Sequence, residues 1–106
     1  MPCLIVQIVR FVDSHQPSWV QCEFVDADGR HHLIKEKVPI VTSADLDANS
    51  QYPKLGGIRC EILKRYRNEK GQEVASITTL RPLSIESTEG ASEFTVPIAL
   101  ISALDD

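Results

Sequence analysis

The chain has 106 residues, of which 42% are hydrophobic and 25% charged, and its formal net charge at pH 7 is −4. This composition excludes a globally disordered chain, and the length fits one domain with its own core, so we expect a single domain over residues 1–106. No apolar run reaches the ~20 residues that cross a bilayer. The first residues also lack the basic start of a signal peptide, so we expect a cytoplasmic protein without membrane contact.

The three cysteines, Cys3, Cys22 and Cys60, stand in apolar or alternating stretches. They show no CxxC spacing, and no histidines follow them at zinc-finger spacing. We therefore expect reduced, buried thiols of a reducing compartment, with neither a disulfide nor a bound metal.

Three strands are predicted in the first part of the chain, at residues 3–12, 18–25 and 30–38. The first is apolar on both faces, which is typical of a central strand or of one that crosses between two packing surfaces. The second and third are joined by residues 26–29, whose Asp-Gly end is a strong hairpin signal. Charged residues interrupt the alternation of the third strand, which indicates an edge strand.

A less regular segment follows. Residues 39–42 fit a bend or a short further strand. Residues 43–48 predict one or two helical turns, with Ser43 as a possible N-cap and acidic groups in the first turn. Residues 49–57 have the composition of a loop.

A hairpin is predicted over residues 57–80, and we expect the chain to be organised around it. Its arms are residues 57–66 and 72–80, and a polar loop over 67–71 ends on a glycine. The first arm alternates between apolar and mostly polar positions, as a half-buried strand does. We expect six side chains from two strands to share one core: Val20, Cys22, Phe24, Ile58, Cys60 and Ile62.

The last part of the chain predicts a short strand at residues 83–86 and a closing strand at 93–102. Pro97 interrupts the closing strand, which indicates an edge position or a bulge. Five to six strands with one short helical turn predict an all-β fold. We expect a small, partly open antiparallel barrel, and a two-layer β-sandwich is the alternative.

Four short segments carry a resemblance to a known family. They are Trp-Val-Gln-Cys at residues 19–22, Asp-Ala-Asp-Gly at 26–29, Lys-Val-Pro at 37–39 and Ile-Glu-Ser-Thr-Glu-Gly at 85–90. Together they resemble a family of small uncharacterised bacterial proteins, over residues 8–96. The resemblance implies a bacterial, soluble, β-rich protein, and it assigns no activity and no catalytic residues.

Three groups contain residue types that occur in active or metal sites. His31 and His32 are neighbours on a predicted strand, so they point to opposite faces and cannot easily share an ion. Residues 13–15 read Asp-Ser-His, but side chains adjacent in sequence rarely reach triad geometry. Glu86 and Glu89 fit a solvated turn. We expect no catalytic, cofactor or metal site, and no enzyme.

The clearest candidate surface is a basic island in an otherwise acidic chain. Residues 54–82 carry seven basic and three acidic side chains. Trp19 is the one tryptophan, and it is either an exposed anchor or a core residue. The candidate partner-binding residues are Trp19, Lys64, Arg65, Tyr66, Arg67 and Lys70.

We expect a non-enzymatic protein-interaction domain with a protein partner. The alternative is a small barrel that binds single-stranded nucleic acid through the hairpin tip over residues 64–70, where basic groups surround Tyr66. A sequence pI of about 5.3 and an aromatic content of 6% make nucleic acid the less favoured partner.

Overall fold

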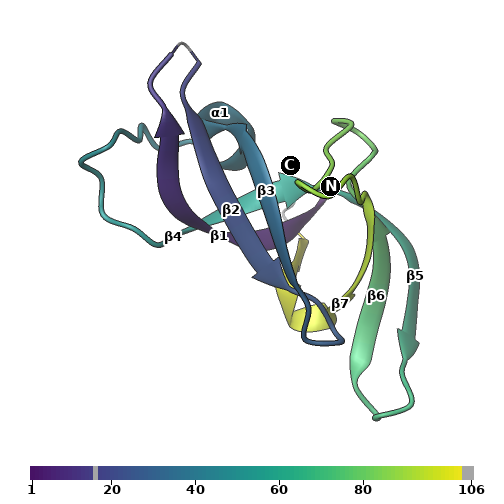
Figure 1. The fold of residues 1–106 in the computed structure, drawn as a ribbon. Helices are drawn as coiled ribbons and strands as arrows, with labels where there is room; N and C mark the ends of the chain where they lie inside the picture. Colours follow the sequence, from purple (N-terminus) through teal and green to yellow (C-terminus); the bar gives the residue numbers. More distant parts are fainter. Residues whose placement is uncertain (16, 104–106) are drawn as a thin grey trace.

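The computed structural model describes residues 1–15 and 17–103 and consists of two antiparallel sheets (Figure 1). The first sheet has the order β3-β2-β1-β4, formed by β1 (Pro2–Asp13), β2 (Trp19–Val25), β3 (His31–Lys37) and β4 (Lys54–Arg59), and β8 (Ile101–Ala103) pairs with β1. The second sheet has the order β5-β6-β7, formed by β5 (Glu61–Arg67), β6 (Glu73–Thr78) and β7 (Glu93–Pro97). Two short helical segments, α1 (Val38–Val41) and the 3-10 turn η1 (Ile98–Leu100), complete the described fold.

The predicted fold class is confirmed: the protein is all-β and antiparallel, with partly open sheets and short helical turns. The described residues form eight strands rather than the predicted five to six. Two predicted strands are each divided in the structure. The strand predicted over residues 57–66 is divided between β4 and β5. The closing strand predicted over residues 93–102 is divided between β7 and β8, with η1 starting after Pro97.

Cys60 is the corner at which the chain passes from one sheet to the other. β4, before it, pairs with β1, whereas β5, after it, pairs with β6. The Cys60 N–H donates to the carbonyl of Pro2 at 3.1 Å, which ties the corner to the start of β1. Alternation continues through Cys60, so the sequence shows one strand where there are two. Only β5 and β6 form the hairpin.

β1 lies between β2 and β4, as its two apolar faces predict. Leu4, Val6 and Ile8 are buried on its inner face. The pairing register with β2 then shifts, so that Phe11 lies opposite Val20 and packs against the core. Before this β-bulge the even-numbered residues face the core, and after it Phe11 does. Core-facing apolar residues therefore occur at both odd and even positions of the strand.

The turn over residues 26–29 joins β2 to β3, as predicted. The Asp26 carboxylate accepts hydrogen bonds from the backbone N–H of Asp28 at 2.8 Å and of Arg30 at 3.0 Å. Gly29 has φ +82°, a conformation that costs glycine little. β3 is an edge strand of its sheet, also as predicted.

The helical turn predicted over residues 43–48 is wrong: the α-helical residues are Val38–Val41. Pro39 stands near the helix start, where its missing N–H costs nothing. Beyond the helix, Thr42 Oγ1 accepts from the Ala44 N–H and Asp47 Oδ1 accepts from the Asn49 N–H. These local bonds compete with helix formation. No helix within the described residues is long and apolar enough to cross a membrane.

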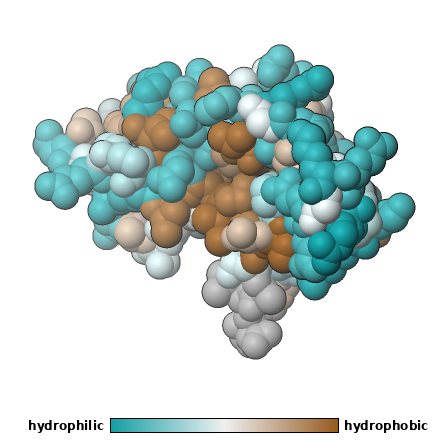
Figure 2. Space-filling model, turned by 90° about the horizontal axis from the view of Figure 1, so that it is seen from below, coloured by the Kyte–Doolittle hydropathy of each residue, from teal (hydrophilic) through white to brown (hydrophobic). Residues whose placement is uncertain are grey.

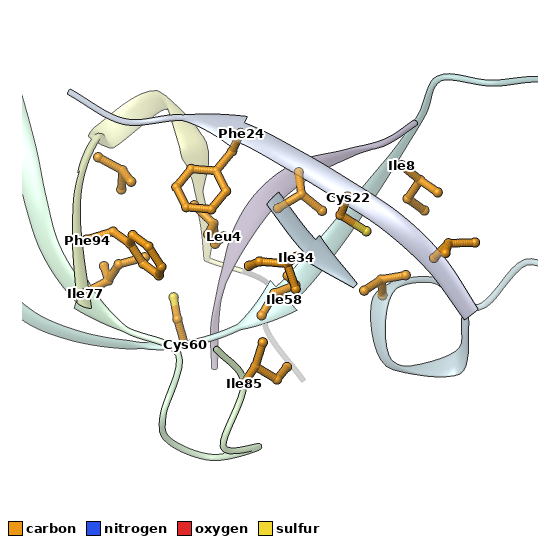
Figure 3. Packing of buried hydrophobic residues seen from close by; sticks show 14 of the residues in the cluster. Leu4, Ile8, Cys22, Phe24, Ile34, Ile58, Cys60, Ile77, Ile85 and Phe94 are labelled. Atoms are coloured by element: carbon orange, nitrogen blue, oxygen red, sulfur yellow. The ribbon is translucent and has the colours of Figure 1, made fainter. Parts of the chain in front are cut away.

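The strand predicted over residues 83–86 is also wrong, because residues 81–83 form a turn and 84–86 have no regular secondary structure. Ser84 takes φ 56°, and its N–H donates to the carbonyl of Leu80 at 2.8 Å. The buried Thr79 hydroxyl donates to the carbonyl of Ile85 at 2.7 Å. The turn thereby places the Ile85 side chain in the core (Figure 3).

One core joins the two sheets. Figure 3 shows Phe94 and Ile77 of the second sheet facing Phe24, Leu4 and Ile34 of the first. Five of the six predicted core residues are buried in this cluster: Val20, Cys22, Phe24, Ile58 and Cys60. The sixth, Ile62, is only partly buried and packs against it. The predicted alternation is therefore correct up to the corner and weakens beyond it.

Candidate functional site

β5 and β6 project from the body of the molecule as an arm, which we call the hairpin arm (residues 61–78; Figure 1). β5 is its outer strand and an edge of the second sheet. Six of its seven residues are exposed and only Ile62 is partly buried. Most of β5 therefore contributes little to the core and presents its side chains to solvent.

The tip of the arm is held by Asn68. Its side-chain Oδ1 accepts from the backbone N–H of Lys70 at 3.1 Å and of Gln72 at 2.9 Å. Its own backbone N–H donates to the carbonyl of Gln72 at 2.9 Å, and Gly71 takes φ +77°. These bonds explain locally why the polar loop forms a tight turn and why β5 and β6 leave it in register.

Residues 64–67 are consecutive on a strand, so their side chains alternate between the two faces of the arm, and a β-bulge at Leu63 sets which face each one takes. Before the bulge, Ile62 lies opposite the buried Ile77. After it, Lys64 lies opposite Ser76 and Arg65 opposite Ala75. Opposed residues of an antiparallel pair share a face, so one face carries Lys64 and Tyr66, and the other carries Arg65 and Arg67.

Few of these charges are neutralised within the protein. The Arg67 guanidinium donates to the carbonyl of Gly71 at 3.0 Å and to the carboxylate of Glu73 at 3.1 Å, and both charged side chains are well exposed. The Lys64 ammonium lies 5.1 Å from the Tyr66 ring centroid, a cation–π contact that leaves its charge in place. Within residues 1–15 and 17–103, neither Lys64, Arg65 nor Lys70 forms an ion pair.

Two hollows adjoin the arm and share Tyr66 and Arg67. One, of about 360 Å³, is lined by Arg65, Tyr66, Arg67, Glu73, Val74 and Ile98. The other, of about 390 Å³, lies between the arm and the β2–β3 turn and is lined by Asp28, Tyr66, Arg67, Asn68, Glu69 and Lys70. The first has an apolar contribution from Val74 and Ile98, whereas charged and amide side chains line the second together with Tyr66. Together they offer an aromatic ring and basic groups to one ligand surface.

The structure brings five of the six predicted partner-binding residues together on the arm; Trp19 is not among them. Trp19 begins β2 in the other sheet, is partly buried and lines neither hollow. The Lys37 ammonium lies 5.5 Å from its ring centroid. Sequence reasoning missed Asp28 and Ile98, since no local pattern links them to a hairpin so distant in the chain.

A separate apolar hollow lies at the end of the molecule formed by η1 and the end of β2. Figure 2, the view from below, shows hydrophobic surface across this side with hydrophilic side chains around it. The hollow measures about 220 Å³, and its lining includes Ile5, Phe24, Val25 and Leu100. Gln7 and Glu23 also line it, but none of its lining residues is a lysine or arginine, so it lacks the basic groups of the arm.

The His32 ring is held in place by neighbouring side chains. Its Nε2 lies 2.7 Å from Asp26 Oδ2, and its ring stacks on Phe24 and meets Phe94 edge-on. Burial alone would raise the pKa of Asp26, but hydrogen bonds from His32 and from the backbone N–H groups of Arg30 and Asp28 lower it. Across residues 1–15 and 17–103, no three His, Cys, Asp or Glu side chains gather closely enough to hold a metal ion.

The three cysteines are free, and two are fully buried. Burial raises the pKa of the Cys22 thiol to about 12, with a further contribution from the charge of Glu36. Burial also raises the pKa of Cys60 to about 11, and nearby Cys3 adds to the shift. Thiolate is the nucleophilic form, so neither buried thiol is a reactive group at neutral pH.

Cys3, which is only partly buried, should therefore be alkylated first by iodoacetamide in the folded protein at mildly alkaline pH. Mass spectrometry of quenched samples would follow each site. Protein unfolded in urea is the control, and there all three thiols should react at similar rates. Modification of Cys22 as early as Cys3 in the folded protein would contradict its placement in the core.

Comparison of the chain with protein-family models, curated proteins and solved structures finds no match.

Proposed function

We propose that this protein is a non-enzymatic interaction domain that docks an acidic segment of a partner protein on its hairpin arm. The observation that carries the proposal is the projecting arm with three unneutralised cations beside two hollows that share Tyr66 and Arg67. Aromatic and arginine side chains are the types that anchor protein interfaces. We further propose a bacterial source, which the sequence resemblance supports, and a cytoplasmic location, which the three free cysteines support.

Charge distribution favours a protein over a nucleic acid. Residues 64–70 carry four basic side chains and Glu69, which gives them a net charge of +3. Because the whole chain has a net charge of −4, the other residues together have a net charge of −7. A nucleic acid strand extends over many ångströms and meets that acidic surface, which weakens its attraction. A protein segment can dock on the arm alone.

Single-stranded nucleic acid is the second candidate. The contact of Lys64 with Tyr66 favours it, because single strands bind to aromatic rings set among basic groups. Against it, Asp28, Glu69 and Glu73 line the two hollows and would repel phosphate. The arm also has a single aromatic side chain on which a base could stack.

The proposal predicts that the folded protein binds a ten-residue peptide of alternating Glu and Val, labelled with a fluorophore for anisotropy. Replacing Arg65 and Arg67 with Gln should weaken binding about tenfold, mainly through slower association, since each tenfold step is about 1.4 kcal/mol. A matched variant with Lys54 and Arg59 replaced by Gln removes two exposed charges from β4, and it should bind within about twofold of the original.

Equal losses in the two double variants would show that net charge, not the arm, attracts the peptide. The same titration uses single-stranded and duplex DNA at about 50 mM and about 200 mM salt, because phosphate contacts give a steep salt dependence. Micromolar DNA binding with such a dependence, and no peptide binding, would overturn the proposal in favour of the nucleic-acid alternative.

A further inference from the structure

We infer that the acidic segment binds as an added β-strand along the open edge of β5, with main-chain hydrogen bonds to the protein. This inference rests on the proposed function and specifies how the partner is held. Addition of an extended peptide to a free sheet edge is a recurrent way of recognising proteins. Three observations point to β5.

First, two other sheet edges are crossed by hydrogen bonds from loops, whereas β5 is not. On β3, the carbonyl of Leu33 accepts from the Thr88 N–H at 2.8 Å. On β7, the carbonyl of Thr95 accepts from the Ala27 N–H at 2.9 Å. The edge strand β4 lies beside α1. In the part of the chain that is described, no loop bonds to the outer edge of β5.

Second, the register of the hairpin shows which backbone groups point outward. The Asn68 N–H donates to the carbonyl of Gln72, so these two residues form a hydrogen-bonded pair. Such pairs alternate with non-bonded pairs in an antiparallel ladder. Tyr66 is therefore bonded to β6, while the N–H and C=O of Arg65 and Arg67 point away from it. These four groups form a template for another strand.

Third, the side chains on this edge determine which strand can be added. Charged residues on an edge strand prevent pairing with a second copy, because like charges would face each other. Lys64, Arg65 and Arg67 therefore disfavour pairing of β5 with itself and favour an acidic strand. The bulge at Leu63 ends the regular edge, so the added strand pairs beside residues 64–67.

Two variants of one residue separate main-chain pairing from charge. Arg65→Ala removes the guanidinium but keeps the outward N–H, whereas Arg65→Pro removes both. Proline is tolerated on an edge strand where the N–H faces solvent, and far-UV circular dichroism with a thermal melt would verify folding. With the Glu-Val peptide, Arg65→Ala should weaken binding about threefold, and Arg65→Pro about tenfold more.

A second measurement does not depend on how the variant folds. Methylating two adjacent backbone nitrogens at the centre of the Glu-Val peptide removes a donor from each edge of the strand and leaves its charges intact. Binding to the unmodified protein should fall about tenfold. Amide hydrogen exchange at Arg65 and Arg67 should slow with the original peptide and remain unchanged with the methylated one.

The outcomes distinguish this inference from the proposed function. If the peptide binds and depends on the charges of Arg65 and Arg67, but Arg65→Pro binds within about twofold of Arg65→Ala and backbone methylation costs less than about twofold, docking stands and strand addition is overturned. If the peptide does not bind, the proposed function and this inference both fail.

Discussion

Replacing Phe94 with alanine is expected to lower the free energy of unfolding by about 3–5 kcal/mol, from lost transfer energy and the cavity left behind. Phe94 comes from β7 and is 5% exposed. Its ring meets Phe24 edge-on, with centroids 5.1 Å apart, and lies 4.8 Å from His32. Both partners belong to the first sheet, so this side chain is a main contact between the sheets. Urea denaturation monitored by Trp19 fluorescence gives the loss.

Phe94→Leu is the control, because it retains most of the apolar volume and loses only the edge-on ring contacts. It should cost clearly less than alanine, about 1–2 kcal/mol, and it should remain folded even if Phe94→Ala does not. A loss below about 1 kcal/mol for Phe94→Ala would show that the two sheets do not share the core described above.

The second large effect is expected at Gly56, a residue of β4 that lies opposite Val6 of β1. A Cβ at this position would stand 2.9 Å from the Val41 carbonyl oxygen of α1 and 2.9 Å from Ile8 Cδ1. The carbonyl belongs to backbone and cannot rotate away as a side chain can. Gly56→Ala should therefore destabilise the protein by about 1–3 kcal/mol, because α1 must move or β4 must shift.

The neighbouring glycine is a matched control. A Cβ at Gly57 would meet nothing closer than Cys3 Cβ at 3.5 Å, which is an ordinary contact. Gly57→Ala should be neutral or stabilise by about 0.4–1 kcal/mol, since alanine restricts the unfolded chain more than glycine does. If thermal melts rank the two variants in the opposite order, α1 does not pack on β4 as the structure has it.

The sequence predicts well those strands whose local pattern and tertiary position agree. β2 alternates cleanly, and Val20, Cys22 and Phe24 are all buried. The Asp-Gly turn after it is also predicted, because its geometry depends on residues within the turn. β1 is identified as central because both of its faces are apolar.

Prediction fails where the chain changes sheet without changing its pattern. β4 ends at Arg59 and β5 starts at Glu61, yet the alternation of apolar residues continues through Cys60 between them. The helix prediction fails for another reason: the side chains of Thr42 and Asp47 accept hydrogen bonds from nearby backbone N–H groups, which competes with helix formation over residues 43–48. The periodicity of apolar residues carries no information about such tertiary contacts or competing local hydrogen bonds.

The candidate site, too, is only partly predictable from the sequence. The cluster of basic residues in the hairpin is visible in the sequence, and the structure places it on an exposed edge strand. The bulge at Leu63, which sets the face that each of these residues takes, depends on pairing with β6. The approach of Asp28 to the tip depends on how the two sheets pack. Neither feature leaves a local sequence signal.

The central claim is that the hairpin arm is the docking surface, and amide chemical-shift mapping tests it most directly. Titration of the isotope-labelled protein with the Glu-Val peptide should produce its largest shifts at residues 64–70, together with Asp28 across the adjoining hollow. Shifts concentrated instead around Ile5, Val25 and Leu100, at the apolar hollow, would contradict the account. So would a spectrum that the peptide leaves unchanged.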